Sequence, residues 1–173
     1  AYGLDFLDDA LVVDIGAGTT DLCRLHGTMP EPDDQRTHEV AGDAIDETLA
    51  GLIKETYPEA QFSINMVRGF KEKFSSVSNK IDEAIVERPG GGKPQKFDIT
   101  ELVYKACYSM VPPTIAALQD LIATYDPEFQ HKMRQNILIG GGGSQISGLG
   151  VAIEHALEEY GGGSATVVEE PQY

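Results

Sequence analysis

The feature that most constrains the fold is a short apolar segment that runs directly into a glycine turn. Leu11 to Ile15 is rich in β-branched residues, and Gly16-Ala17-Gly18 follows at once. A second extended segment, from Thr20 to Leu25, comes immediately after the turn. Two such runs joined by small residues predict a β-hairpin whose first strand is buried. Because the turn carries so little side-chain bulk, its backbone N–H groups can approach an anion closely.

A second glycine run, Gly140 to Gly143, lies near the other end of the chain. By itself it is also compatible with a flexible linker. Its flanks favour another interpretation, because Asn136 to Ile139 predicts a buried strand and a helical pattern follows near residues 149–160. Strand-to-helix turns are common sites of ligand approach in α/β sheets. The run fits neither the P-loop nor the dinucleotide fingerprint.

The remaining pattern mixes helices and strands, which is typical of an α/β fold. Helical spacing predicts a helix over residues 43–56, and Ser63 is a candidate cap for a second one. Thr100 is the candidate cap of a long helix that Pro112-Pro113 interrupts. Further expectations are a polar surface loop over 27–37, an exposed hairpin from 81–88 and 95–97, a helix beginning at Asp126-Pro127, and a strand over 165–168.

Composition narrows the classes of partner. The 173 residues carry a formal net charge of −15, which argues against a broad nucleic-acid face or an anionic membrane face. No segment approaches the length of apolar sequence that a membrane-spanning helix needs, and no signal peptide is visible. The two cysteines, Cys23 and Cys107, lie in no metal-binding or disulfide pattern, which favours a reducing cytoplasm.

Four motifs, taken in order, resemble the nucleotide-binding core of the actin, Hsp70 and sugar-kinase superfamily. Asp14 to Asp21 resembles its second phosphate-binding hairpin, and Gly140 to Gly148 resembles its adenosine motif. Val40 to Glu47 is similar to the segment that opens a helix near the nucleotide in bacterial actins. Met66 to Lys73 resembles the actin helix whose Lys and Glu lie beside ribose and adenine, although alone it is typical of a solvated helix face. The spacing is most similar to the MreB branch, and in particular to its magnetosome-aligning members.

The resemblance implies an actin-like (ribonuclease H-like) ATPase domain, with a mixed β-sheet, flanking helices and an inserted smaller α+β subdomain. Asp14 would be the catalytic carboxylate and would hold Mg²⁺ through water. ATP or ADP would be bound by residues from all four motifs: Gly16, Ala17, Gly18, Thr19, Thr20, Gly42, Asp43, Lys71, Glu72, Gly141, Gly142, Gly143, Gln145 and Ile146.

The resemblance also implies a division of the chain and a role for the intact protein. Residues 1–42 and 99–173 would form a core subdomain, and residues 43–98 the inserted one. The first phosphate loop and the catalytic Glu or Gln of the family would lie outside this chain, so we expect the fragment alone to be inactive. We expect the intact protein to be a cytoplasmic ATPase that polymerises into filaments with MgATP.

The expected partners are further copies of the protein, the missing first domain and magnetosome adaptor proteins, with no nucleic acid and no membrane insertion. Two alternatives from the same superfamily stay open at this point. One is a domain of a sugar- or acetate-kinase-type enzyme, and the other is an Hsp70-like chaperone. The inserted segment 43–98 resembles an actin subdomain and weighs against the kinases.

Overall fold

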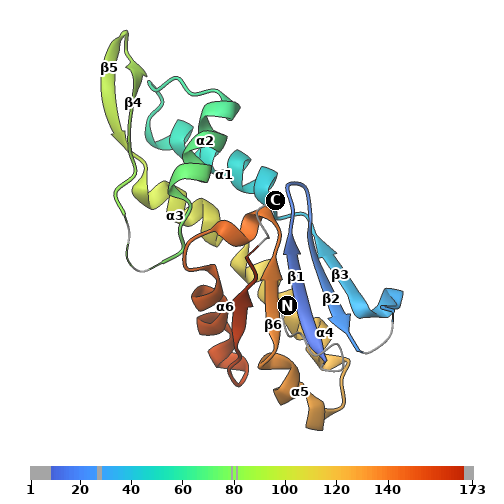
Figure 1. Cartoon of the computed structure of the whole chain (residues 1–173). Helices are drawn as coiled ribbons and strands as arrows, with labels where there is room; N and C mark the ends of the chain where they lie inside the picture. Colours follow the sequence, from blue (N-terminus) through green and yellow to red (C-terminus); the bar gives the residue numbers. More distant parts are fainter. Residues whose placement is uncertain (1–8, 27–28, 79, 81, 170–173) are drawn as a thin grey trace.

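The computed structural model describes residues 9–26, 29–78, 80 and 82–169. Its main sheet has five strands in the order β3-β2-β1-β6-β7, as Figure 1 shows in part. The first three strands are antiparallel neighbours, whereas β6 and β7 run parallel to β1. The expected mixed sheet with flanking helices is therefore confirmed. The strands are β1 (Ala10–Ile15), β2 (Thr20–Leu25), β3 (Gln35–His38), β6 (Ile137–Gly140) and β7 (Ala165–Val167).

Helices pack on the sheet through its alternating apolar side chains. Leu11, Val13 and Ile15 of β1 are fully buried, as the period of two in a strand requires when one face is covered. Helix α4 (Val111–Ala123) contacts β2 and β3, and α6 (Leu149–Leu157) contacts β7 and α4. A short helix, α5 (Pro127–Arg134), connects α4 to β6. The parallel strands β1, β6 and β7 are thus joined through helices.

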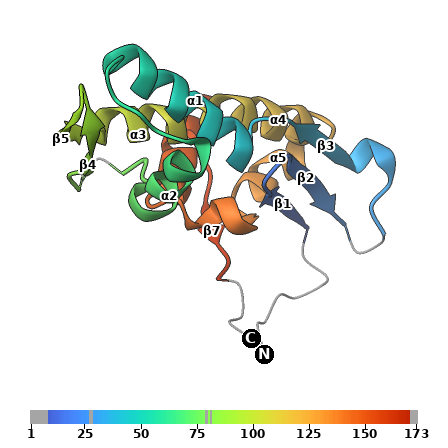
Figure 2. The ribbon, with the colours of Figure 1, turned by 90° about the horizontal axis from the view of Figure 1, so that it is seen from above.

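The remaining elements extend away from the sheet, so that the hairpin β4–β5 lies at one end of the molecule and β3 at the other (Figure 2). Phe97 of this hairpin packs edge-on against Tyr57 and Phe62, which fixes the hairpin to the helices. These elements are α1 (Gly42–Thr56), α2 (Ile64–Phe74), β4 (Ile85–Gly90), β5 (Lys93–Asp98) and α3 (Thr100–Tyr108).

Two local predictions are wrong. The expected loop over 27–37 contains a 3-10 turn at Pro32–Asp34 and most of β3, while residues 27–28 lie outside the described part. β3 is an edge strand that pairs with β2 through backbone hydrogen bonds. Its sequence therefore need not show the apolar alternation by which a buried strand is predicted. Thr100 is the first residue of α3 rather than its cap. Its hydroxyl donates to Asp98 Oδ1 and accepts from the Ala84 amide, so it ties the helix to β5 instead.

Candidate functional site

The two glycine-rich loops meet at one cavity of about 750 Å³, between the sheet and the helices α1 and α2. The first loop is the turn between β1 and β2, and the second follows β6. The start of α1 and one face of α2 complete the wall. The lining residues are Gly16, Ala17, Gly42, Asp43, Ile45, Asp46, Arg68, Lys71, Glu72, Ser75, Gly142, Gly143, Gln145 and Ile146.

The turn between β1 and β2 is held by its own hydrogen bonds. The Gly16 amide donates to the Thr19 carbonyl at 2.9 Å, and the buried Thr20 hydroxyl donates to the Val40 carbonyl at 3.0 Å. Within the described residues, the amides of Ala17 and Gly18 have no backbone acceptor. The amides of Ala17 and Gly18, like that of Thr19, are therefore available to an anion, whereas the Gly16 N–H and the Thr20 hydroxyl serve the turn itself.

The N-terminus of α1 is bonded directly to this turn. The Gly42 amide donates to Gly16 O at 3.1 Å, and the Asp43 amide donates to Ala17 O at 2.7 Å. Amides at a helix start have no acceptor within the helix, so the turn carbonyls satisfy them. The positive end of the α1 dipole consequently lies beside the turn, which favours a negative ligand there.

The loop after β6 passes so close to the end of β1 that two of its residues, Gly141 and Gly143, leave no room for a side chain. Gly141 has φ +82°, and a Cβ on it would lie 2.5 Å from Ile15 O and would also overlap Asp14 Oδ1. A Cβ on Gly143 would collide with the Ile15 side chain. The 3-10 helix η2 (Gly142–Gln145) then continues along the cavity wall. The sequence analysis attributed this glycine run to the approach of a ligand. Packing against β1 accounts for two of its glycines, Gly141 and Gly143.

The charged side of the cavity is built around a buried carboxylate. Asp46 is 1% exposed, and it pairs with Arg68 Nε at 3.0 Å and with Lys71 Nζ at 2.7 Å. The hydrogen bond from Arg68 to Asp46, with the charge of Asp46, raises the pKa of the guanidinium. Arg68 and Lys71 are thus part of a defined network rather than of a merely solvated helix face.

The structure brings most of the predicted site residues together, but not all of them. Five do not line the cavity: Asp14, Gly18, Thr19, Thr20 and Gly141. Asp14 is exposed at the end of β1, close to Gly141. Four lining residues lay outside the predicted set: Ile45, Asp46, Arg68 and Ser75. A signal for Asp46 exists in the sequence, because this acid directly follows Ile45 on the apolar face of α1.

Comparison with known proteins decides between the possible relatives. The MreB/Mbl protein family matches residues 7–171. The chain belongs to this family. The predicted resemblance to the MreB branch is confirmed, and nothing in the match favours the kinases or the chaperones.

Among MreB/Mbl relatives, the chain is 41% identical to the actin-like protein MamK of Paramagnetospirillum magneticum over 99% of its residues and 50% of that protein. It is 42% identical to a non-polymerising MamK mutant bound to AMPPNP, covering 98% of this chain and 52% of that one, with a TM-score of 0.91. A MamK double helical filament gives 41%, with 99% and 53% covered, and the same TM-score of 0.91. The chain therefore spans about half the length of the relatives it matches.

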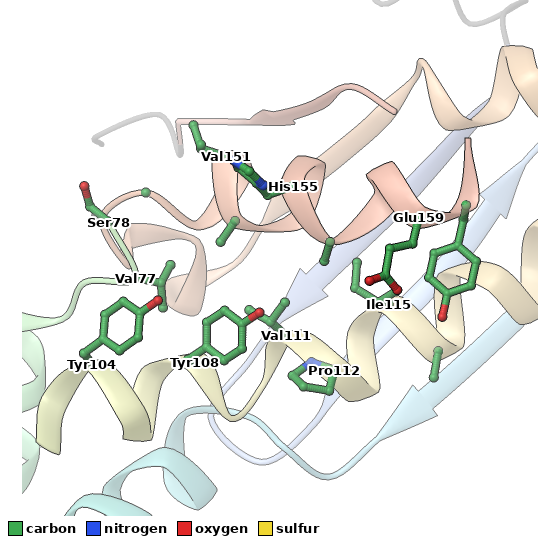
Figure 3. A pocket seen from close by; sticks show the side chains of 15 residues that line it. Val77, Ser78, Tyr104, Tyr108, Val111, Pro112, Ile115, Val151, His155 and Glu159 are labelled. Atoms are coloured by element: carbon green, nitrogen blue, oxygen red, sulfur yellow. The ribbon is translucent and has the colours of Figure 1, made fainter. Parts of the chain in front are cut away.

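This member of the MreB/Mbl family has a second cavity of about 620 Å³, between α3, α4 and α6 (Figure 3). Tyr104 and Tyr108 line it with stacked rings whose centroids are 5.9 Å apart. Among the described residues, its lining includes no Lys or Arg, and it contains neither the turn after β1 nor the loop start at Gly141. The first cavity, with its glycine loops and cations, is thus the better candidate for a phosphorylated ligand.

The described residues offer no ready-made metal cluster and no membrane helix. Within them, no group of three or more His, Cys, Asp or Glu side chains could hold a metal ion. None of the helices in the described ranges is long and apolar enough to cross a bilayer. Burial raises the pKa of the Cys107 thiol to about 11, so this cysteine is protonated and unsuited to nucleophilic chemistry.

Proposed function

We propose that this chain forms one side of the MgATP site of a bacterial actin-like ATPase, and that the intact protein polymerises into filaments. The observation that carries this proposal is the convergence of both glycine loops, the α1 N-terminus, Lys71 and Glu72 on one cavity. Its close relatives include a MamK filament and a MamK mutant bound to AMPPNP. By this analogy the filament is cytoplasmic and aligns magnetosomes, with copies of the protein and adaptor proteins as partners.

The phosphate end of the nucleotide would lie at the turn between β1 and β2. The free amides of Ala17 and Gly18 would donate to the phosphates, helped by Thr19 N–H and by the dipole of α1. Asp14 suits a hydrated magnesium ion, because its carboxylate is exposed and Mg²⁺ prefers few protein oxygens together with water and phosphate. The ion would supply neutralisation of phosphate charge.

The nucleoside end would lie between α2 and the loop after β6. Lys71 and Glu72 would flank the ribose and base, while Gly142, Gly143 and Ile146 would pass beneath the adenine. Hydrolysis of a phosphoanhydride depends mostly on positioning and on charge neutralisation. We therefore infer that turnover requires the intact protein, with residues 1–42 and 99–173 as the core subdomain and 43–98 as the inserted one.

The direct test uses the full-length protein that contains this chain. We expect saturable binding of a fluorescent ATP analogue, competed by unlabelled ATP, and filaments in electron micrographs with MgATP.

Asp14→Ala should abolish phosphate release and leave the thermal unfolding midpoint unchanged, because Asp14 is exposed. Asp120→Asn, which alters an exposed carboxylate on α4 outside the cavity, is the matched control. Unchanged phosphate release from Asp14→Ala would remove this residue from its role, and absent nucleotide binding by the wild type would refute the function.

A further inference from the structure

Asp46 is a charged residue in a position that usually holds an apolar one. It lies on α1 beside Ile45 and Leu49, which are 1% and 0% exposed, and is itself 1% exposed. Burying a carboxylate costs several kcal/mol unless cations and hydrogen bonds compensate for the lost water. Two cations from α2 provide this compensation, since Arg68 Nε bonds Oδ2 at 3.0 Å and Lys71 Nζ lies 2.7 Å from Oδ1.

Lys71 extends this network to the phosphate-side turn. Besides Asp46, its ammonium donates to the Gly42 carbonyl at 3.0 Å. The amide of the same Gly42 donates to Gly16 O at 3.1 Å. A continuous series of polar contacts therefore leads from Asp46 through Lys71 and Gly42 to the turn between β1 and β2. Because Gly42 packs against Ala17 and Lys71, a shift of the ammonium would be transmitted to the turn.

The hydrogen bonds of Lys71 and Arg68 show which of their N–H donors remain available to a ligand. An ammonium has three donors; that of Lys71 donates one hydrogen bond, to the Gly42 carbonyl, and forms an ion pair with Asp46 Oδ1, so it retains capacity to donate to a ligand. Arg68 uses Nε on Asp46, and its side chain as a whole is 46% exposed. One of these, NH2, is 3.6 Å from Asp43. Both residues line the cavity, so their remaining donors face the space where a ligand would bind.

We propose that Asp46 is a positioning residue of the nucleotide pocket. Its carboxylate holds Lys71 and Arg68 in the orientation that presents their remaining donors to the nucleotide, and through Gly42 it fixes the phosphate-side turn. This inference rests on the proposed function. The proposed role of Asp46 differs from charge balance alone. A carboxylate that only neutralised Arg68 and Lys71 would weaken the binding of an anion, whereas a carboxylate that positions them strengthens it.

The two roles predict opposite effects, which permits a decisive experiment on the full-length protein. The variants are Asp46→Asn, which removes the charge at nearly constant shape, Lys71→Met, and the double variant. Asp120→Asn is the control, because it removes an exposed carboxylate that pairs with Arg36 outside the cavity. The affinity for a fluorescent ADP analogue is measured at a temperature where each variant is folded, and thermal unfolding is recorded separately.

If Asp46 positions the cations, Asp46→Asn weakens ADP binding about tenfold, as expected for the loss of one charged hydrogen bond. Lys71→Met then has a similar effect, and the double variant is little weaker than either single one, because both changes break the same network. Binding that is unchanged or tighter in Asp46→Asn overturns the proposal, even if the unfolding midpoint falls. A wild-type protein without ADP binding overturns both this proposal and the function on which it rests.

Discussion

At the scale of single residues, Gly141 shows how closely the loop after β6 approaches β1. Its φ of +82° disfavours any L side chain, and an added Cβ would meet both Ile15 O and the Asp14 carboxylate. We expect Gly141→Ala to lower the free energy of unfolding by about 2–4 kcal/mol, from overpacking and backbone strain together. Urea unfolding measures this loss. Because the clash displaces Asp14, phosphate release should fall as well.

Gly142 provides the matched control for Gly141. It is the next residue of the same loop, its φ is not positive, and a Cβ on it would meet no atom within 4 Å. Gly142→Ala should therefore change stability by less than about 1 kcal/mol. Equal losses in the two variants would mean that the flexibility of the whole loop matters, rather than the close approach of Gly141 to β1.

At the scale of elements, the hairpin β4–β5 depends on one aromatic anchor. Phe97 is 2% exposed, and its ring centroid lies 5.1 Å from that of Tyr57 and 5.8 Å from that of Phe62. We expect Phe97→Ala to cost about 3–5 kcal/mol, as buried phenylalanines do, and to lower hydrogen-exchange protection over residues 85–98.

The same substitution should change nucleotide affinity by less than about twofold, because α2 is also held to α1 by the ion pairs of Asp46. Lys96→Ala, on an exposed position of β5, is the control for the hairpin. A loss of affinity as large as the loss of stability would show that the hairpin supports the cavity, contrary to this expectation.

The elements that the sequence predicted well are those whose apolar period is visible in one segment. Leu11 to Ile15 and the helix with Ile45, Leu49 and Ile53 are examples, and both formed at nearly the predicted bounds. Ser63 also caps α2 as expected, since its hydroxyl accepts from the Met66 amide at 3.2 Å. In these segments, local propensity and burial favour the same structure.

What the sequence did not reveal depends on partners far along the chain. β3 consists of polar residues at a sheet edge, and its pairing with β2 is made by backbone groups that every residue has. The pairing of Asp46 with Arg68 spans 22 positions and two helices, so the pattern of either helix alone could not show it. Similarly, the Thr100 hydroxyl accepts from the amide of Ala84, 16 positions earlier, instead of capping its own helix.

At the scale of the whole molecule, the net charge of −15 is compatible with an anionic ligand because the cavity is locally different. The turn Gly16 to Thr19 carries no charged side chain, and its amides and the α1 dipole provide positive potential there, whereas Arg68 and Lys71 share the cavity with Asp43, Asp46 and Glu72. In the proposed function, phosphate would be recognised by backbone groups that do not enter the count of side-chain charges.

The exposure of this site leads to a prediction for the isolated chain. Asp14, Gly16, Ala17, Gly18 and Thr19 are all exposed, so one side of the phosphate end is open to water. The chain also covers only 50% of the MamK relative. Polar contacts exposed to water contribute little, and phosphoryl transfer needs groups on both sides of the phosphates.

We therefore expect purified 1–173 to bind a fluorescent ADP analogue at least about tenfold more weakly than the full-length protein, which corresponds to 1.4 kcal/mol. It should release no phosphate from MgATP above the buffer background. Circular dichroism and a cooperative thermal transition would establish that the fragment is folded, so that inactivity cannot be ascribed to misfolding. Steady phosphate release by the folded fragment would show that residues 1–173 by themselves contain a complete hydrolytic site, and would overturn the expectation that turnover needs further chain.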